Sequence, residues 1–479
     1  MVSFSTLCTG GNLDNTARYD ALTTSNEISY QNALNDRNFR FAEACESMLT
    51  NYCWTEADAD KSIQFALSSR LLPQNIYFGI DVWAQNKSSF THPRVTFPKY
   101  GGGGTNTGIA VAKLAELGLS AGIFAPAWSF EHLRGHGQHV ERVVWEGAPL
   151  PDNIDCSCGD CASRHRPNEE FAIIKHVRER AAGSDTFFYT NFNRAFGAHG
   201  HRLRDLYGGN YIHAQLGAQS ILPRPIISRD NNQAIQLSHR LETAHNCTRL
   251  VIESKQTKPI ESEFPEQWLP LYKLDIAVYP LFSFCYNKPS TSDAVVSMYC
   301  KTTAGVTQIA FEAVGYGTKS TSIGFSRCAN ARIQELGIVL KKLPTTAVGE
   351  TTRLVELLEV AILPRFTGQH PWLTNGINNI RFEHRGEGEN QHIGLCWEYD
   401  DTASPGDRIE GMPYSETTGP FSHFRIQVDG LDLGRAYALQ HVLNKTLVDR
   451  ITGRDIDVVI TGLRFDGSKI AEASCRLRL

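Results

Sequence analysis

The sequence lacks the features of an exported or membrane-spanning chain. Its first residues, MVSFSTLCTGGNLDN, contain neither a basic stretch nor the continuous apolar run of a secretory signal. No later apolar run approaches the length of about 20 residues that crosses a bilayer. Charge of one sign is also lacking, since 47 Lys and Arg oppose 51 Asp and Glu for a formal net charge of -4. We therefore expect a cytosolic protein with neither a nucleic-acid nor a membrane partner, because both require a basic surface.

The 12 cysteines do not form an evident disulfide framework. Most are scattered through a chain that is large enough to fold without covalent crosslinks, so we expect reduced thiols. One local group, CSCGDCASRH, places Cys156, Cys158, Cys161 and His165 within ten residues. Its C-x-C-x-x-C spacing is not one of the common paired zinc-binding forms. Free cysteines in a loop between domains are the favoured interpretation, with a zinc site as the alternative.

The first part of the chain alternates apolar, strand-like runs with segments of helical spacing. The strand-like runs are ARYDAL, SMLTNYCW, NIYFGIDVW and SAGIFAPAWSF. TGIAVAKLAELGL, between the last two, has helical spacing and follows a run of glycines that suits a loop. The strand-like runs recur every thirty to forty residues or so, the length of a strand and its crossover helix in a parallel α/β unit.

Residues with useful chemistry stand at the carboxyl end of each of these strands. They are Tyr19 and Asp20, Asn51 and Trp54, Asp81 and Trp83, and Trp128 with Glu131. Active sites of (β/α)₈ barrels gather at that face. A closed barrel needs eight units and four are recognisable here. We therefore predict that residues 1–184 form the C-terminal half of a TIM-type barrel, strands five to eight, whose first half is not in this chain.

The remainder of the chain predicts all-β structure. Short β-branched and aromatic runs such as AVVSMYCKTT, HFRIQVDG and DIDVVITGLRF are separated by Gly, Pro and Asn. This pattern is typical of antiparallel β-sandwich domains. We predict one sandwich over residues 185–345 and a second over 346–479, with a boundary near KKLPTTAVGE. The fold class is thus α/β followed by all-β.

Aromatic and acidic residues at strand ends suit a sugar ligand. Aromatic faces stack on sugar C–H faces, and carboxylates and amides bind hydroxyls. Trp54, Trp83 and Trp128 fit this role together, although each alone is equally compatible with core packing. Asp81 and Glu131 could form the acid and nucleophile of a two-carboxylate glycosidase. We favour the alternative in which each only bonds a backbone amide or a ligand hydroxyl. We expect Asp20 to bond within the rim of the barrel, where the strands end.

Several longer stretches resemble family 85 of the glycoside hydrolases, the cytosolic endo-β-N-acetylglucosaminidases. They are RYDALTTSNEISYQNALNDRNFRFAEACESMLTNYCW, IYFGIDVWAQN, LGLSAGIFAPAWSFE, FFYTNFNRAFG and AQLGAQSILP. The resemblance implies cleavage between the two core N-acetylglucosamines of N-glycans on proteins or peptides. It implies substrate assistance, in which the sugar's own 2-acetamido oxygen attacks the anomeric carbon to give an oxazolinium ion. It implies no metal and no organic cofactor.

The resemblance also assigns roles to individual residues. Tyr19 matches the tyrosine that assists the oxazolinium step, and Tyr30 stands where family members usually carry a tryptophan that gates the acceptor side. The positions expected to bind the glycan are Tyr30, Asn51, Trp54, Asp81, Trp83, Trp128 and Glu131. The family's orienting asparagine and its acid–base glutamate, two residues later, precede the tyrosine by roughly thirty residues. The eighteen residues before Tyr19 contain no glutamate.

This departure leads to two expectations for the chain. It is a truncated form of the enzyme that begins after the catalytic Asn-x-Glu pair, and it has weak or no activity. The alternative is a non-catalytic protein that binds N-glycans without cleaving them.

Overall fold

The computed structural model describes most of the chain and divides it into two compact units. The first unit comprises Met1–Glu179 with Pro225–Asp230, and the second comprises Arg180–Arg224 with Asn231–Leu479. The described residues are 17–85, 96–99, 101–133, 135–150, 169–192, 220–226, 234–244, 247–259, 264–277, 280–288, 293–313, 318–324, 331–343, 347–364, 376–386, 392–399 and 411–479.

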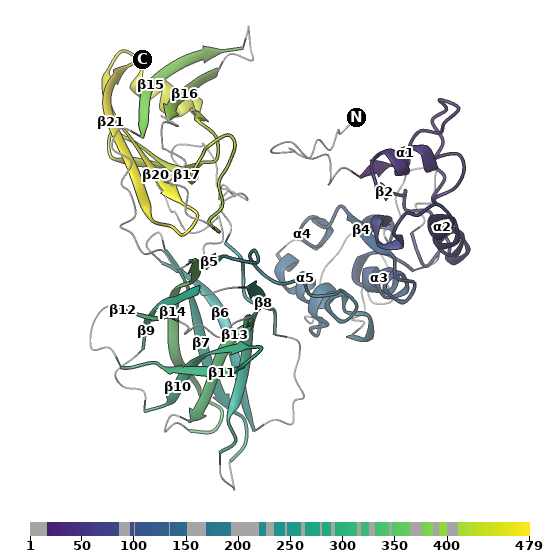
Figure 1. Cartoon of the computed structure of the whole chain (residues 1–479), viewed down its shortest axis with the longest axis horizontal. Helices are drawn as coiled ribbons and strands as arrows, with labels where there is room; N and C mark the ends of the chain where they lie inside the picture. Colours follow the sequence, from purple (N-terminus) through teal and green to yellow (C-terminus); the bar gives the residue numbers. More distant parts are fainter. Residues whose placement is uncertain are drawn as a thin grey trace. The chain divides into compact units, whose positions relative to one another are not determined.

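The first unit is built on a four-stranded parallel sheet, drawn from purple to blue in Figure 1. Its strands β1 (Arg18–Tyr19), β2 (Met48–Leu49), β3 (Ile76–Asp81) and β4 (Ser120–Phe124) lie in sequential order, and each pairs in parallel with the next. Helices lie between them: α1 (Phe39–Ala44), α2 (Glu56–Ser68) and α3 (Thr107–Glu116). The predicted alternation of four strands and helices is confirmed. Closure into half of a TIM-type barrel stays a prediction.

Short helices complete the first unit. They are the 3₁₀ helices η1 (Pro73–Asn75), η2 (Val82–Gln85), η3 (Gly104–Asn106), η4 (Glu169–Phe171) and η5 (Ile173–Lys175), with the α-helices α4 (Trp128–His132) and α5 (Gly137–Glu146). The glycine run ahead of α3 forms the loop that the sequence predicts, and η3 leads directly into the helix.

Helix α2 shows how local sequence builds this unit. Thr55 and Asp58 form a reciprocal capping box, which satisfies backbone N–H groups that the first turn would leave unpaired. Ala59, Ser62 and Ala66 are the buried residues of the helix, at the spacing of one helical face. This face packs into a core that also holds the side chains of β3 and α3.

The second unit is antiparallel β-structure. Its first ten strands are β5 (Phe188–Thr190), β6 (Ile235–Ala244), β7 (Cys247–Gln256), β8 (Gln267–Ala277), β9 (Pro280–Asn287), β10 (Val295–Thr302), β11 (Gly305–Ala310), β12 (Lys319–Gly324), β13 (Arg332–Lys342) and β14 (Thr351–Pro364). One sheet has the order β11-β10-β13-β8, and the other has the order β12-β9-β14-β7-β6 with β5 paired to β14. That these sheets form a sandwich stays a prediction.

Strand β14 corrects the predicted boundary between residues 345 and 346. It lies beyond that boundary, yet it pairs antiparallel with β7, β9 and β5 of the preceding sheet. The segment near KKLPTTAVGE therefore connects β13 of one sheet to β14 of the other. The first two sheets of the second unit thus extend to Pro364, the end of β14.

The rest of the second unit contains two further sheets and one helix. The strands are β15 (Ile377–Arg385), β16 (His392–Tyr399), β17 (Phe421–Val428), β18 (Leu431–Ala436), β19 (Gln440–Val442), β20 (Asp455–Arg464) and β21 (Lys469–Arg478), with α8 (Lys445–Ile451) before β20. The sheet orders are β15-β16-β19 and β18-β17-β20-β21. A shared core includes Trp397 of β16 and Phe424 of β17, whose rings meet edge to face at 5.2 Å.

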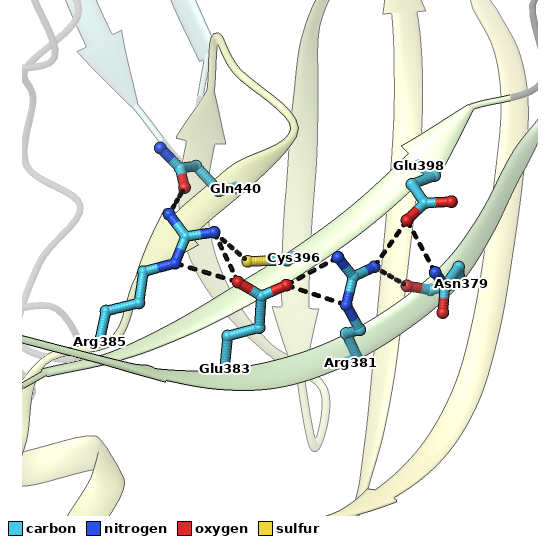
Figure 2. Close-up of polar contacts among 7 residues, drawn as sticks. All are labelled: Asn379, Arg381, Glu383, Arg385, Cys396, Glu398 and Gln440. Atoms are coloured by element: carbon cyan, nitrogen blue, oxygen red, sulfur yellow. Dashed lines mark hydrogen bonds and ion pairs between the residues drawn. The ribbon is translucent and has the colours of Figure 1, made fainter.

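A row of charged side chains runs along β15. Figure 2 shows Glu383 between Arg381 and Arg385. The Glu383 carboxylate lies 2.7 Å from Arg381 Nη2 and 2.6 Å from Arg385 Nη2. Arg381 also bonds Glu398 of β16, and Arg385 donates to Gln440 of β19. These contacts link the three strands of the sheet. The two Arg and two Glu charges balance, so the row does not form a field of one sign that would attract a charged ligand.

Candidate functional site

The candidate site begins where the first two parallel strands end. Tyr19 is the last residue of β1, and Asn51 follows β2 by two residues. Because neighbouring parallel strands end on the same edge, the two side chains meet, and the Tyr19 hydroxyl donates to Asn51 Oδ1 at 3.0 Å. Tyr19 is 41% exposed. Partial burial, together with Tyr30 and Tyr52, raises the pKa of Tyr19 to about 12, so the phenol keeps its proton at neutral pH.

Tyr30 lies beside Tyr19. Their ring centroids are 6.0 Å apart with the planes tilted by 59°, and half of the Tyr30 side chain is exposed. Tyr30 follows a small antiparallel bridge between Leu22 and Ile28, which turns the chain back after β1. Tyr19 and Tyr30, to which the resemblance assigns roles, are eleven residues apart in the sequence, and their rings are neighbours in the structure.

Asp20, the residue after Tyr19, is buried. Its Oδ2 accepts hydrogen bonds from the backbone N–H groups of Gln31 at 2.9 Å and Asn32 at 2.6 Å, and its Oδ1 accepts from Asn38 Nδ2 at 3.1 Å. Burial raises the pKa of the Asp20 carboxyl, and these bonds act in the opposite direction. The expectation that Asp20 bonds within the rim is confirmed.

Two aromatic residues that the sequence patterns did not single out stand at the same edge. Tyr52 and Phe124 stack with ring centroids 6.0 Å apart and planes 22° apart. Phe124 ends β4, and about half of its side chain is exposed. Both follow the rule that identified their neighbours, since Tyr52 is adjacent to Asn51 and Phe124 is the last residue of a strand.

Trp54 lies in the core of the unit, 2% exposed. Its indole Nε1 donates to the carbonyl of Gly79 in β3 at 2.8 Å. One face of the ring stacks on Phe97 at 4.6 Å with planes 3° apart, and Phe78 meets it edge on. Although Trp54 stands near the end of a strand, its ring is buried, as in the core-packing alternative.

Trp128 and Trp83 are also part of this core. Trp128, which begins α4, is 0% exposed and stacks on His132 at 5.4 Å. Trp83 is partly buried and meets the same imidazole edge on at 5.9 Å. Burial lowers the pKa of His132. The three tryptophans expected to stack on a sugar thus contribute to packing in this structure.

The two candidate carboxylates have different surroundings. Asp81, at the end of β3, is 1% exposed, and its Oδ1 accepts the backbone N–H of Trp83 at 3.0 Å. Its own backbone N–H donates to Thr96. Glu131 is exposed on α4. Asp81 therefore makes the backbone bond that the favoured alternative anticipated, and it braces the turn from β3 into η2.

The predicted cysteine group lies outside the described residues, so Cys156, Cys158, Cys161 and His165 stay untested as a zinc site. Within the described ranges, no three His, Cys, Asp or Glu side chains gather closely enough to hold a metal ion. Among the helices that the structure describes, none combines the length and the apolar character needed to cross a membrane.

Known proteins show a consistent likeness to this chain. A stretch of 115 residues is 31% identical to the cytosolic endo-beta-N-acetylglucosaminidase of Gallus gallus, covering 24% of this chain and 14% of that protein. A stretch of 224 residues is 25% identical to cytosolic endo-beta-N-acetylglucosaminidase 2 of Arabidopsis thaliana, covering 46% of this chain and 26% of that protein. The chain thus matches about a quarter or less of the length of these relatives.

A solved structure shares the fold. The glycoside hydrolase domain of Endo-D from Streptococcus pneumoniae R6 superposes with a TM-score of 0.58 over 96% of this chain and 68% of that one, at 13% sequence identity. The family model described as Glycosyl hydrolase family 85 matches residues 11–200, which include Tyr19, Tyr30 and Asn51. Over these residues, the chain is similar to glycosyl hydrolase family 85.

Proposed function

We propose that this chain acts on N-glycans as an endo-β-N-acetylglucosaminidase, at the bond between the two core N-acetylglucosamines. The observation that carries the proposal is the Tyr19–Asn51 pair, bonded at 3.0 Å at the carboxyl ends of two parallel strands within the family 85 segment. Free or peptide-linked N-glycans are the proposed substrates. The cytosol is the proposed location, because the relatives are named for it.

Tyr19 has the chemistry that a substrate-assisted reaction needs. When the 2-acetamido oxygen attacks the anomeric carbon, positive charge develops on the acetamido group as the oxazolinium ring closes. The oxygen of a neutral phenol can accept a hydrogen bond from the acetamido N–H, and a polar group placed where charge develops stabilises a transition state. At neutral pH the Tyr19 phenol keeps its proton. In the free protein the same O–H donates to Asn51, so we propose that Asn51 holds the phenol ready for the sugar.

Tyr30 is proposed to line the acceptor side. A tyrosine at this position keeps an aromatic face for a sugar and adds a hydroxyl that a tryptophan lacks. Its half-exposed ring beside Tyr19 is compatible with this role. We therefore propose a different balance between water and sugar acceptors from that of a tryptophan-bearing relative.

We propose cleavage together with glycan binding at Tyr19, Tyr30 and Asn51. The non-catalytic glycan-binding alternative makes the same binding prediction and differs in allowing no cleavage at all.

Mass spectrometry of a high-mannose glycopeptide incubated with the full chain tests the proposal. We expect release that leaves a single N-acetylglucosamine on the peptide and that Tyr19→Phe abolishes. Trp145→Phe is the matched control, because it alters a surface aromatic whose indole bonds Glu141 on α5. Retained binding without cleavage supports the glycan-binding alternative. Turnover that survives Tyr19→Phe but fails in Asp81→Asn or Glu131→Gln contradicts the proposal and supports a two-carboxylate mechanism.

A further inference from the structure

We propose that Asp20 is a positioning residue that fixes the Tyr30 loop to the end of β1, beside the Asn51 segment, before any glycan binds. The inference rests on the proposed function, because it explains how the rim is preorganised for a sugar. Asp20 is 1% exposed, so it is closed off from solvent. Its effect on the substrate would therefore act through the residues it holds.

Asp20 makes hydrogen bonds to the segment after Tyr30 and to strand β2. Two of them come from the backbone N–H groups of Gln31 and Asn32, the residues immediately after Tyr30. The backbone N–H of Asp20 donates to the carbonyl of Leu49 in β2, two residues before Asn51, at 2.9 Å. Asp20 thus bonds the segment after Tyr30 through its carboxylate and the strand before Asn51 through its backbone. Bonds to an ionised acceptor are about twice as strong as neutral ones, which suits a carboxylate that anchors a loop.

A second tie joins the same two segments. Asn32 Oδ1 accepts the backbone N–H of Cys53 at 3.1 Å, which connects the Tyr30 loop to the loop after β2. Asn32 adopts a φ of 55°, in the left-handed region that Asn and Gly tolerate best. Its conformation and its side-chain bond therefore both serve this connection.

Asn38 extends the anchor into the loop. Its Nδ2 donates to Asp20 Oδ1 and also to the carbonyl of Ala33, and its Oδ1 accepts the N–H of Asn35. In Asp20→Asn, an amide must replace one carboxylate oxygen. It would face either the Asn38 amide or the Gln31 and Asn32 N–H groups, so donors would oppose donors. The substitution preserves shape and removes the anchor.

Hydrogen exchange read by mass spectrometry tests the anchor without relying on any sugar. In Asp20→Asn of the full chain, we expect exchange at Gln31 and Asn32 to accelerate about tenfold or more, while the amides of β3 keep their rates. Asp58→Asn is the matched control. It also removes a carboxylate that accepts a backbone N–H, that of Thr55, but at the start of α2, and should leave residues 29–32 unchanged.

Calorimetric titration with a high-mannose glycopeptide then tests the role in binding. We expect Asp20→Asn to weaken binding about tenfold and Asp58→Asn to leave it within about twofold. Unchanged exchange at residues 29–32 in Asp20→Asn overturns the anchor. Faster exchange with unchanged affinity overturns its role for the glycan. A wild-type chain that does not bind the glycopeptide contradicts the proposed function, and the exchange experiment alone then decides the anchor.

If Asp20→Asn fails to fold, Asn32→Gly provides the second variant. Glycine keeps the left-handed backbone and loses the bond to Cys53. Faster exchange at residues 29–32 with weaker binding supports the coupling of the two loops, and no change in either contradicts it.

Discussion

The substitution Trp54→Phe tests whether Trp54 contributes to the stability of the core or to sugar binding. The change removes the indole N–H that donates to Gly79 at 2.8 Å and shortens the ring that stacks on Phe97. A net hydrogen bond contributes about 1 kcal/mol. The lost apolar contact and the space left behind add about 2 kcal/mol. We expect the free energy of unfolding of the first unit to fall by about 3 kcal/mol in total.

The assay must read the first unit separately, because two units need not unfold together. Hydrogen exchange along a thermal ramp, followed in peptides from residues 76–85, reports the midpoint of this unit. A loss of about 3 kcal/mol corresponds to a midpoint lower by about 6–12 °C for a unit of this size. Below that midpoint, glycopeptide affinity should stay within about twofold of wild type.

Two further variants complete this comparison. Trp145→Phe, at the surface of α5, should lower the midpoint much less. Tyr30→Ala should reduce glycopeptide affinity with little effect on the midpoint, because its side chain is half exposed. The reasoning is refuted if Trp54→Phe leaves the midpoint unchanged and removes glycan binding, since Trp54 would then be a sugar contact and not a core residue.

Three other substitutions or titrations test the structure. Glu356→Gln removes the partner of Arg249 and Arg353; because Glu356 is buried, the variant should lose about 3 kcal/mol in urea unfolding at pH 7. Burial raises the Glu356 pKa but the two Arg outweigh it, so in wild type this stabilisation should fade as acid titrates the carboxylate below its ordinary pKa. Asn444→Ala removes the side-chain cap of α8 and should cost about 1 kcal/mol by the same assay. NMR of ring-labelled tyrosine should find the Tyr19 pKa near 12, and its contribution to stability should be complete below pH 10 and lost as pH rises through 12; a titration near 10 contradicts the partial burial that raises it.

The strand ends of the first unit could be predicted because they depend on local sequence. Strand and helix periodicities place Tyr19 and Asn51 at the carboxyl ends of successive parallel strands, and parallel pairing then brings them to one edge. Asp20 was expected to bond within the rim, although its partners were not foreseen. They arise from a turn eleven residues later in the chain, which no periodicity encodes.

Burial of individual aromatic rings could not be predicted in the same way. Trp54 and Trp128 stand near strand ends in sequence, but Phe97 and His132 occupy their faces. Phe97 is 43 residues from Trp54, so that contact depends on tertiary packing, whereas His132 follows Trp128 by four residues within the short helix α4. Phe124, the smaller ring, is the exposed one. The sheet to which β14 belongs could not be predicted either, because it is determined by pairing with β7 and β9, which are distant in sequence.

Calorimetric titration of the full chain with a high-mannose glycopeptide tests the central claim most directly. That claim is that the rim formed by Tyr19, Tyr30 and Asn51 holds an N-glycan. The account predicts saturable binding that both Tyr19→Phe and Tyr30→Ala weaken and that Trp145→Phe leaves unchanged. Absence of binding by the wild-type chain, or binding that is indifferent to both rim substitutions, would contradict it.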